Sequence, residues 1–337
     1  MKILITGVAG FVGFHVARKL ISKNFKVIGI DNLNNYYEVS LKKNRLKNIL
    51  NNSNDKNFKF YSKDIRDQKS IKSIFCKEKP EIVIHLAAQP GVRYSLINPR
   101  LYLETNIMGF FNVIEESRKY NIKHFLYASS SSVYGANKKI PFAETDPANH
   151  PLQLYAATKR SDELIAHSYS FLYNLPTTGL RFFTVYGPWG RPDMSVFIFT
   201  KKILNKEIIK ISNGEIYRDY TYISDISDCI FSLIKKIPKK KSYLYKDFLP
   251  NNSSIAPYSI FNIGNNKPIK LTKLIEIIEK ELNIKCKKKF VKKNSMDMNY
   301  TCADINEIEK KMNFSSRITA EEGIKNFVNW YKDYYKK

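Results

Sequence analysis

Tyr155 and Lys159, four residues apart, carry the clearest potential for chemistry in this sequence of 337 residues. In a helix this spacing places both side chains on one face. A phenol ionises near pH ~10 and is a poor base at neutral pH, but a nearby ammonium favours its phenolate form. The pair can therefore act as a general base on a sugar or alcohol hydroxyl.

A run of serines, 129–132, closes a short apolar stretch that begins at Lys123. Strand ends of an open α/β sheet face one crevice, so a serine hydroxyl there can bridge a reacting oxygen and the tyrosine. A Tyr-x-x-x-Lys spacing or a serine-rich loop is common by chance when it occurs alone. Their combination downstream of a nucleotide-binding loop is specific, and the N-terminus supplies such a loop.

Gly7, Gly10 and Gly13 lie between an expected strand and an expected helix, in the pattern of a dinucleotide-binding loop. Such glycines allow a tight turn and let the backbone approach a pyrophosphate. Phe11 and Val12 begin the expected helix, whose N-terminal N–H groups and dipole favour the negative charge of that pyrophosphate. This loop is the predicted phosphate cradle.

Asp31, at the end of the second expected strand, supplies the carboxylate that the motif requires. A carboxylate there can accept both ribose hydroxyls and would repel a 2′-phosphate, which favours NAD over NADP. Asp64 follows the third strand and could meet the adenine amino group. The predicted cofactor-binding residues are Gly7, Gly10, Phe11, Val12, Gly13, Asp31, Asn32, Asp64, Ile65, Leu86, Ala87 and Ala88.

Strands and amphipathic helices alternate over the first half of the chain, which indicates βαβ units on a parallel sheet. The strands are almost continuously apolar, so helices should cover both faces. We therefore predict an α/β fold with a doubly wound parallel sheet, a Rossmann domain. The expected strands are Lys2–Thr6, Lys26–Ile30, Phe58–Ser62, Glu81–Ala87, Lys123–Ser129 and Thr177–Phe183, and the expected helices are Phe11–Lys23, Asn106–Tyr120 and Leu154–Asn174.

Loop-like segments rich in Pro, Gly and Asn become common after about residue 183. This change predicts a Rossmann domain at 1–180 and a smaller C-terminal substrate-binding domain at 181–337. The boundary is not expected to be clean. Segments near 220–228 and 259–264 should return to the first domain, the latter as a strand.

Composition excludes several classes of protein. Hydrophobic residues make up 43% of the chain and charged residues 26%, as in globular proteins. The four cysteines form no CxxC pair and the five histidines show no ligand spacing, so no metal or disulfide framework is predicted. No apolar run approaches the ~18 residues of a membrane helix, and no signal-peptide cleavage site follows the N-terminal apolar stretch. A cytoplasmic protein without a membrane partner is expected.

A formal net charge of +25 is large and would suit nucleic acid, a membrane surface or an anionic substrate. Much of the excess lies in Lys-rich runs within 235–241 and 287–293. No RNA-binding or helix-turn-helix signature accompanies them. We therefore favour compositional drift over a nucleic-acid partner.

The glycine loop, Asp31, the serine-rich strand end, the Tyr-Lys pair and the chain length together resemble the extended short-chain dehydrogenase/reductase family. Its NAD-dependent nucleotide-sugar epimerases and dehydratases are the most similar members. The resemblance covers nearly the whole chain. It implies that Ser130, Tyr155 and Lys159 are catalytic. Ser130 stands where the family has its catalytic Ser or Thr, three positions before the valine of Val-Tyr-Gly. Asn106 matches a family asparagine near the active site, and it joins Tyr155 and Lys159 in the predicted cofactor contacts.

Four segments, 31–37, 88–93, 150–155 and 184–194, look like the corresponding segments of UDP-glucuronate 4-epimerases. By that resemblance Thr184 and Arg191 approach the sugar carboxylate, and an arginine fork suits a carboxylate. The resemblance also assigns Arg218 to the UDP diphosphate. The predicted substrate-binding residues are Arg93, Ser131, Ser132, Thr184, Arg191 and Arg218.

The loop 294–304 departs from the family pattern, since Met296 stands where glycine is common. The family's diphosphate contacts are therefore not carried over to this loop. Lys292 and Lys293, its neighbours, could substitute for them.

The serine run also distinguishes between reactions. Dehydratases of the family place an Asp-Glu pair after the catalytic Ser or Thr, and its decarboxylases typically keep a Glu. Ser131 and Ser132 stand there instead and cannot exchange protons as carboxylates do near pH 7. We therefore predict an isomerase that interconverts UDP-glucuronate and UDP-galacturonate through a 4-keto sugar with tightly bound NAD.

Alternatives remain open at this point: a 4-epimerase of UDP-glucose and UDP-galactose, one of UDP-N-acetylhexosamine or its uronic acid, or more remotely a non-catalytic NAD-binding protein. The resemblance further implies a homodimer formed through two helices per subunit. The candidate helices are Asn106–Tyr120 and Leu154–Asn174. Polysaccharide biosynthesis is the natural destination of UDP-galacturonate.

Overall fold

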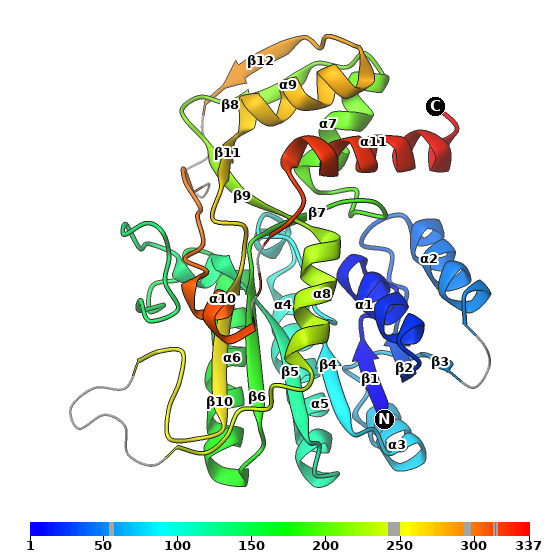
Figure 1. Ribbon diagram of the computed structural model, residues 1–337, viewed down its shortest axis with the longest axis vertical. Coiled ribbons are helices and arrows are strands. Elements are labelled where there is room, and N and C mark those ends of the chain that lie inside the picture. The colour runs from blue at the N-terminus through cyan, green and yellow to red at the C-terminus, as the bar shows by residue number, and fades with distance from the viewer. Residues whose placement is uncertain (54–56, 242–249, 293–297, 313, 315) are drawn as a thin grey trace.

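A seven-stranded parallel sheet forms the centre of the structure, a computed structural model that describes residues 1–53, 57–241, 250–292, 298–312, 314 and 316–337 (Figure 1). Its strand order is β10-β6-β5-β4-β1-β2-β3, so the order reverses between β1 and β4. A crevice is expected outside the carboxyl ends of the strands at such a reversal. The strands are β1 (Lys2–Thr6), β2 (Lys26–Asp31), β3 (Phe58–Ser62), β4 (Ile82–His85), β5 (His124–Ser130), β6 (Thr177–Phe182) and β10 (Tyr258–Ile263).

Helices cover both faces of this sheet, as its apolar strands require. Along β1, Ile3 and Ile5 belong to one hydrophobic cluster and Leu4 belongs to the other, because alternate side chains point to opposite faces. α1 (Phe11–Ser22) and α8 (Ile223–Leu233) pack on the first face, and α3 (Gln68–Glu78), α5 (Gly109–Lys119) and α6 (Leu154–Tyr173) pack on the second. The predicted doubly wound α/β fold is confirmed.

Two predicted elements differ from those observed by more than one residue at an end. β4 ends at His85, so Leu86, Ala87 and Ala88 lie just beyond the strand. The helical segment expected from Asn106 begins earlier, at α4 (Pro99–Tyr102), and passes through the π-helix η2 (Leu103–Met108) into α5. Asn98 starts it, since its side chain accepts a hydrogen bond from the N–H of Leu101.

Smaller elements gather beyond the carboxyl ends of the central strands, as Figure 1 shows for β7, α7, α9 and α11. The strands among them form a three-stranded sheet, ordered β11-β9-β7, and a two-stranded sheet of β12 and β8. The elements are β7 (Thr184–Tyr186), α7 (Ser195–Leu204), β8 (Ile209–Ser212), β9 (Tyr217–Tyr222), β11 (Pro268–Lys270), α9 (Leu271–Leu282), β12 (Lys288–Val291), α10 (Asn306–Met312) and α11 (Ala320–Tyr335). α2 (Val39–Asn51) and the 3₁₀ turns η1 (Tyr94–Leu96) and η3 (Ser131–Tyr134) complete the fold.

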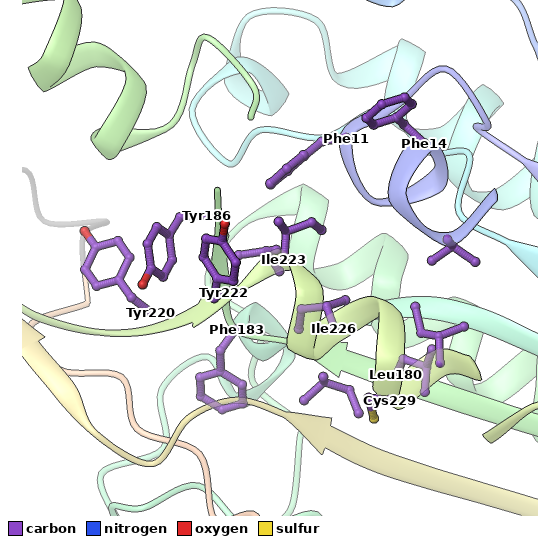
Figure 2. Close-up of a cluster of buried hydrophobic side chains, with 14 of the residues drawn as sticks. Phe11, Phe14, Leu180, Phe183, Tyr186, Tyr220, Tyr222, Ile223, Ile226 and Cys229 are labelled. Atoms are coloured by element: carbon purple, nitrogen blue, oxygen red, sulfur yellow. The ribbon is translucent and has the colours of Figure 1, made fainter. Parts of the chain in front are cut away.

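An aromatic and aliphatic cluster joins the two parts of the molecule (Figure 2). Tyr186 of β7 packs edge-on against Tyr220 and Tyr222 of β9, with ring centroids 5.9 and 5.6 Å away. Phe14 of α1 and Ile226 of α8 belong to the same buried cluster. The C-terminal elements are therefore held on the sheet by continuous packing.

The two segments predicted to return to the first domain contact it. β10 pairs in parallel with β6 at one edge of the central sheet, from Tyr258 opposite Thr177 to Ile263 opposite Phe182. β9 leads directly into α8, which packs on the sheet beside α1. Among the described residues, none of the helices has the length and apolar character needed to cross a bilayer.

Candidate active site

A cavity of about 410 Å³ opens at the carboxyl ends of the central strands. This volume is in the range of small-molecule sites. It is lined by the glycine loop, the segment after β2, the segment after β4, the serine run, α6 and the start of the C-terminal part. The predicted site residues that line it are Gly7, Gly10, Phe11, Val12, Gly13, Asp31, Asn32, Ile65, Leu86, Ala87, Ala88, Ser130, Ser131, Ser132, Tyr155, Lys159, Thr184 and Arg191.

The glycine loop forms a cradle that no larger side chain fits. Gly7 has a φ of +73°, and a Cβ on it would lie 2.8 Å from the backbone nitrogen of Ala87. A Cβ on Gly13 would lie 2.1 Å from the carbonyl oxygen of Gly7. α1 begins after Gly10 without a side-chain cap, so its first N–H groups remain available to an anion at the cavity.

Asp31 is held in place by the backbone on both sides of it. Its Oδ2 accepts the N–H of Ala9 at 3.0 Å, and its Oδ1 accepts that of Leu33 at 2.9 Å. Burial nevertheless raises the pKa of this carboxyl. Neighbouring Asn32 donates its side-chain amide to Asp64 at 2.8 Å, but Asp64 does not line the cavity and also pairs with Arg66.

The serine run follows β5 and turns at once into η3. Ser130 is the last residue of the strand, and its Oγ accepts the N–H of Ser132 at 3.2 Å. The Ser130 hydroxyl also lies 3.2 Å from that of Ser132. This turn brings Ser130, Ser131 and Ser132 to the cavity wall with Tyr155.

Tyr155 and Lys159 occupy the first turns of α6, and both line the cavity. The ring of Tyr155 packs edge-on against Tyr102, with centroids 6.2 Å apart. Lys159 is almost fully buried, and its ammonium donates to Oδ2 of Asp162 at 2.8 Å. The sequence analysis did not anticipate Asp162, which shares the helix with the pair.

Asn106 was predicted to contact the cofactor, but its side chain lies behind the cavity wall. Its Oδ1 accepts the N–H of Gln89 at 2.7 Å, and its amide donates to Thr158 Oγ1 at 3.0 Å. It is buried and does not line the cavity. The π-helical turn directs this side chain inward, where it ties the segment after β4 to α6.

The part of the cavity formed by the start of the C-terminal elements carries a paired arginine. Arg191 donates from Nε and from its terminal nitrogen to the two carboxylate oxygens of Asp193, at 2.9 and 2.6 Å. Tyr36 donates its hydroxyl to the same carboxylate at 3.1 Å. Burial raises the pKa of Asp193, but the positive charge of Arg191 outweighs it and holds that pKa below its usual range. Thr184 opens β7 on the same wall.

Two predicted substrate residues lie outside the cavity lining. Arg218, on β9, donates to the carbonyl oxygens of Tyr217 and Asn299, at 2.9 and 3.4 Å. Arg93 immediately precedes η1, next to a segment that reaches the wall. The prediction for Met296 and Lys293 falls outside the residues that the structure describes, whereas Lys292 is described.

Lys42, on α2, lines the cavity although sequence reasoning missed it. Its ammonium donates to the carbonyl and the side-chain oxygen of Asn34, both at 2.7 Å. Burial lowers the pKa of Lys42 to about 8, against the attraction of Asp31. Nothing in a Lys-rich helix distinguishes this lysine from its neighbours, so only the packing of α2 reveals it. Among the described residues, no group of three or more His, Cys, Asp or Glu side chains could hold a metal.

Comparison with known proteins agrees with this geometry. Residues 4–327 match the family described as "GDP-mannose 4,6 dehydratase". The chain belongs to this family of extended short-chain dehydrogenases/reductases. The family resemblance of the loop, the serine run and the Tyr-Lys pair is thereby confirmed.

Close relatives of known name cover the whole chain. The chain is 49% identical over 339 residues to "Protein CapI" of Staphylococcus aureus, covering 100% of both chains. It is 42% identical to the "Probable UDP-glucuronate 4-epimerase" of Rhizobium meliloti, covering 100% of this chain and 98% of that one. The crystal structure of UDP-glucuronic acid 4-epimerase from Bacillus cereus with UDP-glucuronic acid and NAD superposes with a TM-score of 0.88 at 29% identity, covering 99% and 100% of the chains.

Proposed function

We propose that this protein acts as a UDP-glucuronate 4-epimerase, interconverting UDP-glucuronate and UDP-galacturonate with NAD as cofactor. The observation that carries the proposal is one cavity that joins the glycine loop, Tyr155 and Arg191. A dinucleotide cradle, a proton acceptor and a cation for a carboxylate thus line the same cavity. The relatives from R. meliloti and B. cereus bear this activity in their names.

The residues present fit NAD. The glycine loop turns so tightly that a Cβ on Gly7 or Gly13 would collide with neighbouring backbone, as a dinucleotide cradle requires, and the uncapped start of α1 offers N–H groups to a diphosphate. Asp31 lines the cavity with a backbone-anchored carboxylate for the adenosine ribose. NAD, when bound, accepts the hydride from C4 of the sugar and returns it. Because the cycle closes on itself, NAD should remain bound between turnovers.

Tyr155 takes the proton of the sugar C4 hydroxyl in this proposal, and Ser130 bridges the two oxygens. Both side chains line the cavity, and Ser130 is fixed by the turn that follows β5. The positive charge of Lys159 favours the phenolate form of a neighbouring tyrosine. After the 4-keto sugar has turned in the cavity, Tyr155 would return the proton to the C4 oxygen, while hydride return to the other face of C4 would give the inverted configuration.

Arg191 and Thr184 bind the sugar carboxylate in this proposal. The fork of Arg191 already holds a carboxylate, that of Asp193, through two hydrogen bonds. A 4-keto sugar with a carboxylate at C5 is a β-keto acid, which loses CO₂ readily. Holding the carboxylate away from the alignment that cleavage needs would protect the intermediate.

The arrangement favours epimerisation over elimination of water. Ser131 and Ser132 line the cavity at the positions where the family's dehydratases carry carboxylates. Serine hydroxyls do not exchange protons near neutral pH as an acid-base pair must. Arg218 remains our candidate for binding the UDP diphosphate, and Arg93 remains our candidate for a second contact with the substrate. Neither residue lines the cavity, so the bound sugar nucleotide would extend beyond it to reach them.

We also propose a homodimer. Large exposed apolar side chains gather on α5, α6 and the helical turn before α5; they are Leu103, Met108, Phe111, Leu164, Phe171 and Leu172, each at least 36% exposed. A second copy of this chain would cover them in a helical interface. The Leu164→Glu variant should be monomeric in light scattering, whereas Leu50→Glu, an exposed leucine on α2, should not change the mass. A wild-type monomer would contradict the dimer.

The domain division at 180/181 and the cytoplasmic location belong to the same proposal. The Rossmann part, completed by β10 and α8, binds NAD, and the remaining C-terminal elements bind the UDP sugar. The supply of NAD and nucleotide sugars supports a cytoplasmic site of action. No nucleic-acid partner is needed for this chemistry.

Proton NMR of the purified protein with UDP-glucuronate, without added NAD, tests the function. UDP-glucose and UDP-N-acetylglucosamine serve as parallel substrates. Formation of UDP-galacturonate alone is expected, because NAD remains bound and Arg191 selects the acid. Turnover of a neutral sugar in its place would overturn the role of Arg191. The absence of any turnover, even with added NAD, would overturn the proposal.

A further inference from the structure

Asp162 is a fully buried carboxylate directly behind the Tyr-Lys pair. It follows Lys159 by three residues on α6, and its Oδ2 accepts the ammonium of Lys159 at 2.8 Å. The side chain of Asp162 is 0% exposed and does not line the cavity, whereas Lys159 does. Its other oxygen, Oδ1, has no hydrogen-bond partner among the described residues. Lys159 therefore both lines the cavity and provides the hydrogen bond that this buried carboxylate accepts.

Among the described residues, Lys159 is the one cation that faces Asp162. On the same helix, the carboxylate of Glu163 is bound by Arg181 and Arg160. From β5, the buried phenol of Tyr127 is nearby, with the phenol of Tyr258 beside it, and neither carries a positive charge. From β4, His85 bonds to Thr6, and burial lowers its pKa to about 3, so its ring is neutral.

Such a carboxylate is costly when it is ionised, because burial removes water without supplying enough partners. Burial accordingly raises the pKa of Asp162 to about 7, although Lys159 pulls it down. The carboxyl therefore changes its charge near neutral pH. That change takes place 2.8 Å from the ammonium assigned above to supporting the phenolate.

We propose that Asp162 is a positioning residue that fixes the Lys159 ammonium and, when ionised, weakens its effect on Tyr155. This inference rests on the proposed function, since it concerns the same proton acceptor. A negative charge beside the ammonium partly cancels the field that favours the phenolate. Removal of that charge, with the hydrogen bond to Lys159 kept, should make the phenolate form at lower pH.

The variant Asp162→Asn makes this change with little alteration of shape, because an amide oxygen still accepts from Lys159. Glu116→Gln is a matched control. Glu116 is also buried, also pairs with a lysine three residues later, at 2.9 Å, and also has one oxygen without a partner, but it lies on α5 away from the cavity. Both variants remove one buried negative charge, so a general electrostatic effect would appear in both.

Two measurements on the NAD-loaded enzyme test the proposal. In kcat/KM against pH for UDP-glucuronate, the acid limb of Asp162→Asn should move up to about 1 pH unit lower and become steeper, because the ionisation of Asp162 no longer opposes that of Tyr155. In an ultraviolet titration of tyrosinate, the signal lost in Tyr155→Phe should move in the same direction. In Glu116→Gln, neither the acid limb of kcat/KM nor the tyrosinate signal should move. The amount of retained NAD should be equal in all variants.

The outcomes separate this inference from the proposed function. An unshifted limb and an unshifted tyrosinate signal in Asp162→Asn overturn the role of Asp162, and an equal shift in Glu116→Gln does so too. A shifted tyrosinate signal in a protein that never turns over UDP-glucuronate upholds Asp162 and overturns the function. Asp162→Ser removes the same charge with a smaller side chain, so it provides the test if the Asn variant does not fold.

Discussion

The cofactor side and the sugar side of the cavity are built differently. On the cofactor side backbone contacts dominate, since Gly7 and Gly13 pack against neighbouring backbone and both oxygens of the Asp31 carboxylate accept backbone N–H groups. On the sugar side charged side chains hold one another, as Arg191 and Asp193 do. A backbone cradle is formed before its ligand arrives. Under the proposed function, the ion pair between Arg191 and Asp193 must open before a substrate carboxylate can take the place of Asp193.

Contacts across the cavity rim join the two sides. Arg45 of α2 is fully buried and donates to the carbonyl oxygen of Ala9 in the glycine loop and to that of Trp189, at 2.9 and 2.6 Å. The ring of His15, on α1, bonds to the carbonyl oxygen of Pro188 at 2.9 Å. The turn that carries Arg191 is therefore anchored to the cofactor side. We therefore predict that substitutions on the cofactor side and on the sugar side change different measured properties.

The largest expected effect separates the chemistry from both binding sides. Tyr155→Phe should lower kcat for UDP-glucuronate about 1000-fold, because the general base is removed. Retained NAD, measured after denaturation, should be unchanged, since the glycine loop and Asp31 are intact. Near-normal turnover would show that another group accepts the proton.

Damage to the backbone cradle should be next in size. Gly13→Ala places a Cβ 2.1 Å from the carbonyl oxygen of Gly7 and should lower the free energy of unfolding by about 3 kcal/mol. The protein should also purify without NAD. Gly214→Ala is the control, since a Cβ there meets no atom within 4 Å, although its φ of +103° adds local strain. Full NAD retention in Gly13→Ala would contradict the view that the glycine loop holds the cofactor.

Damage to the sugar side should spare the cofactor. Arg191→Ala should lower kcat/KM for UDP-glucuronate about 30-fold, as expected for the loss of charge-assisted hydrogen bonds worth about 2 kcal/mol. It should also release CO₂ from the 4-keto sugar, while NAD retention stays at the wild-type level. Unchanged kinetics on the acid would show that Arg191 has a structural role only.

The smallest expected effect concerns the link between the sides. Desolvation lowers the pKa of His15 to about 3, so the unfolded chain binds a proton below pH ~6.5 that the folded protein does not. Stability should therefore fall as the pH falls below this value. In denaturant unfolding, the loss between pH 7 and pH 5.5 should be about 1 kcal/mol larger for wild type than for His15→Gln. Equal losses would show that His15 is not held neutral.

The sequence predicted the central sheet well because its signals are local. Continuous apolar runs of β-branched residues identify buried strands, and glycines between a strand and a helix identify the cofactor loop. β1, β3 and the start of α6 have the predicted bounds. The helix expected at Asn106 was displaced, since its true start depends on the cap of Asn98, and its π-helical turn depends on the burial of Asn106 against Gln89.

The sugar side was harder to predict because its contacts link distant segments. Tyr36 meets Asp193 across 157 positions of sequence, and no periodicity reports such a pair. Lys42 and Asp162 resemble ordinary charged residues of a surface helix until packing buries them. Arg218 and Asn106 carried family motifs, yet neither lines the cavity.

The sequence by itself determined the class of fold and located the cofactor loop and the candidates for the reacting groups, because these signals depend on residues close together in the chain. Only the tertiary structure decided which charges face one another. Packing brings Tyr36 to the Asp193 carboxylate across 157 positions, and it removes the water that would otherwise screen Lys159 from Asp162. Distance and dielectric, more than residue type, determine how strongly such groups act on one another.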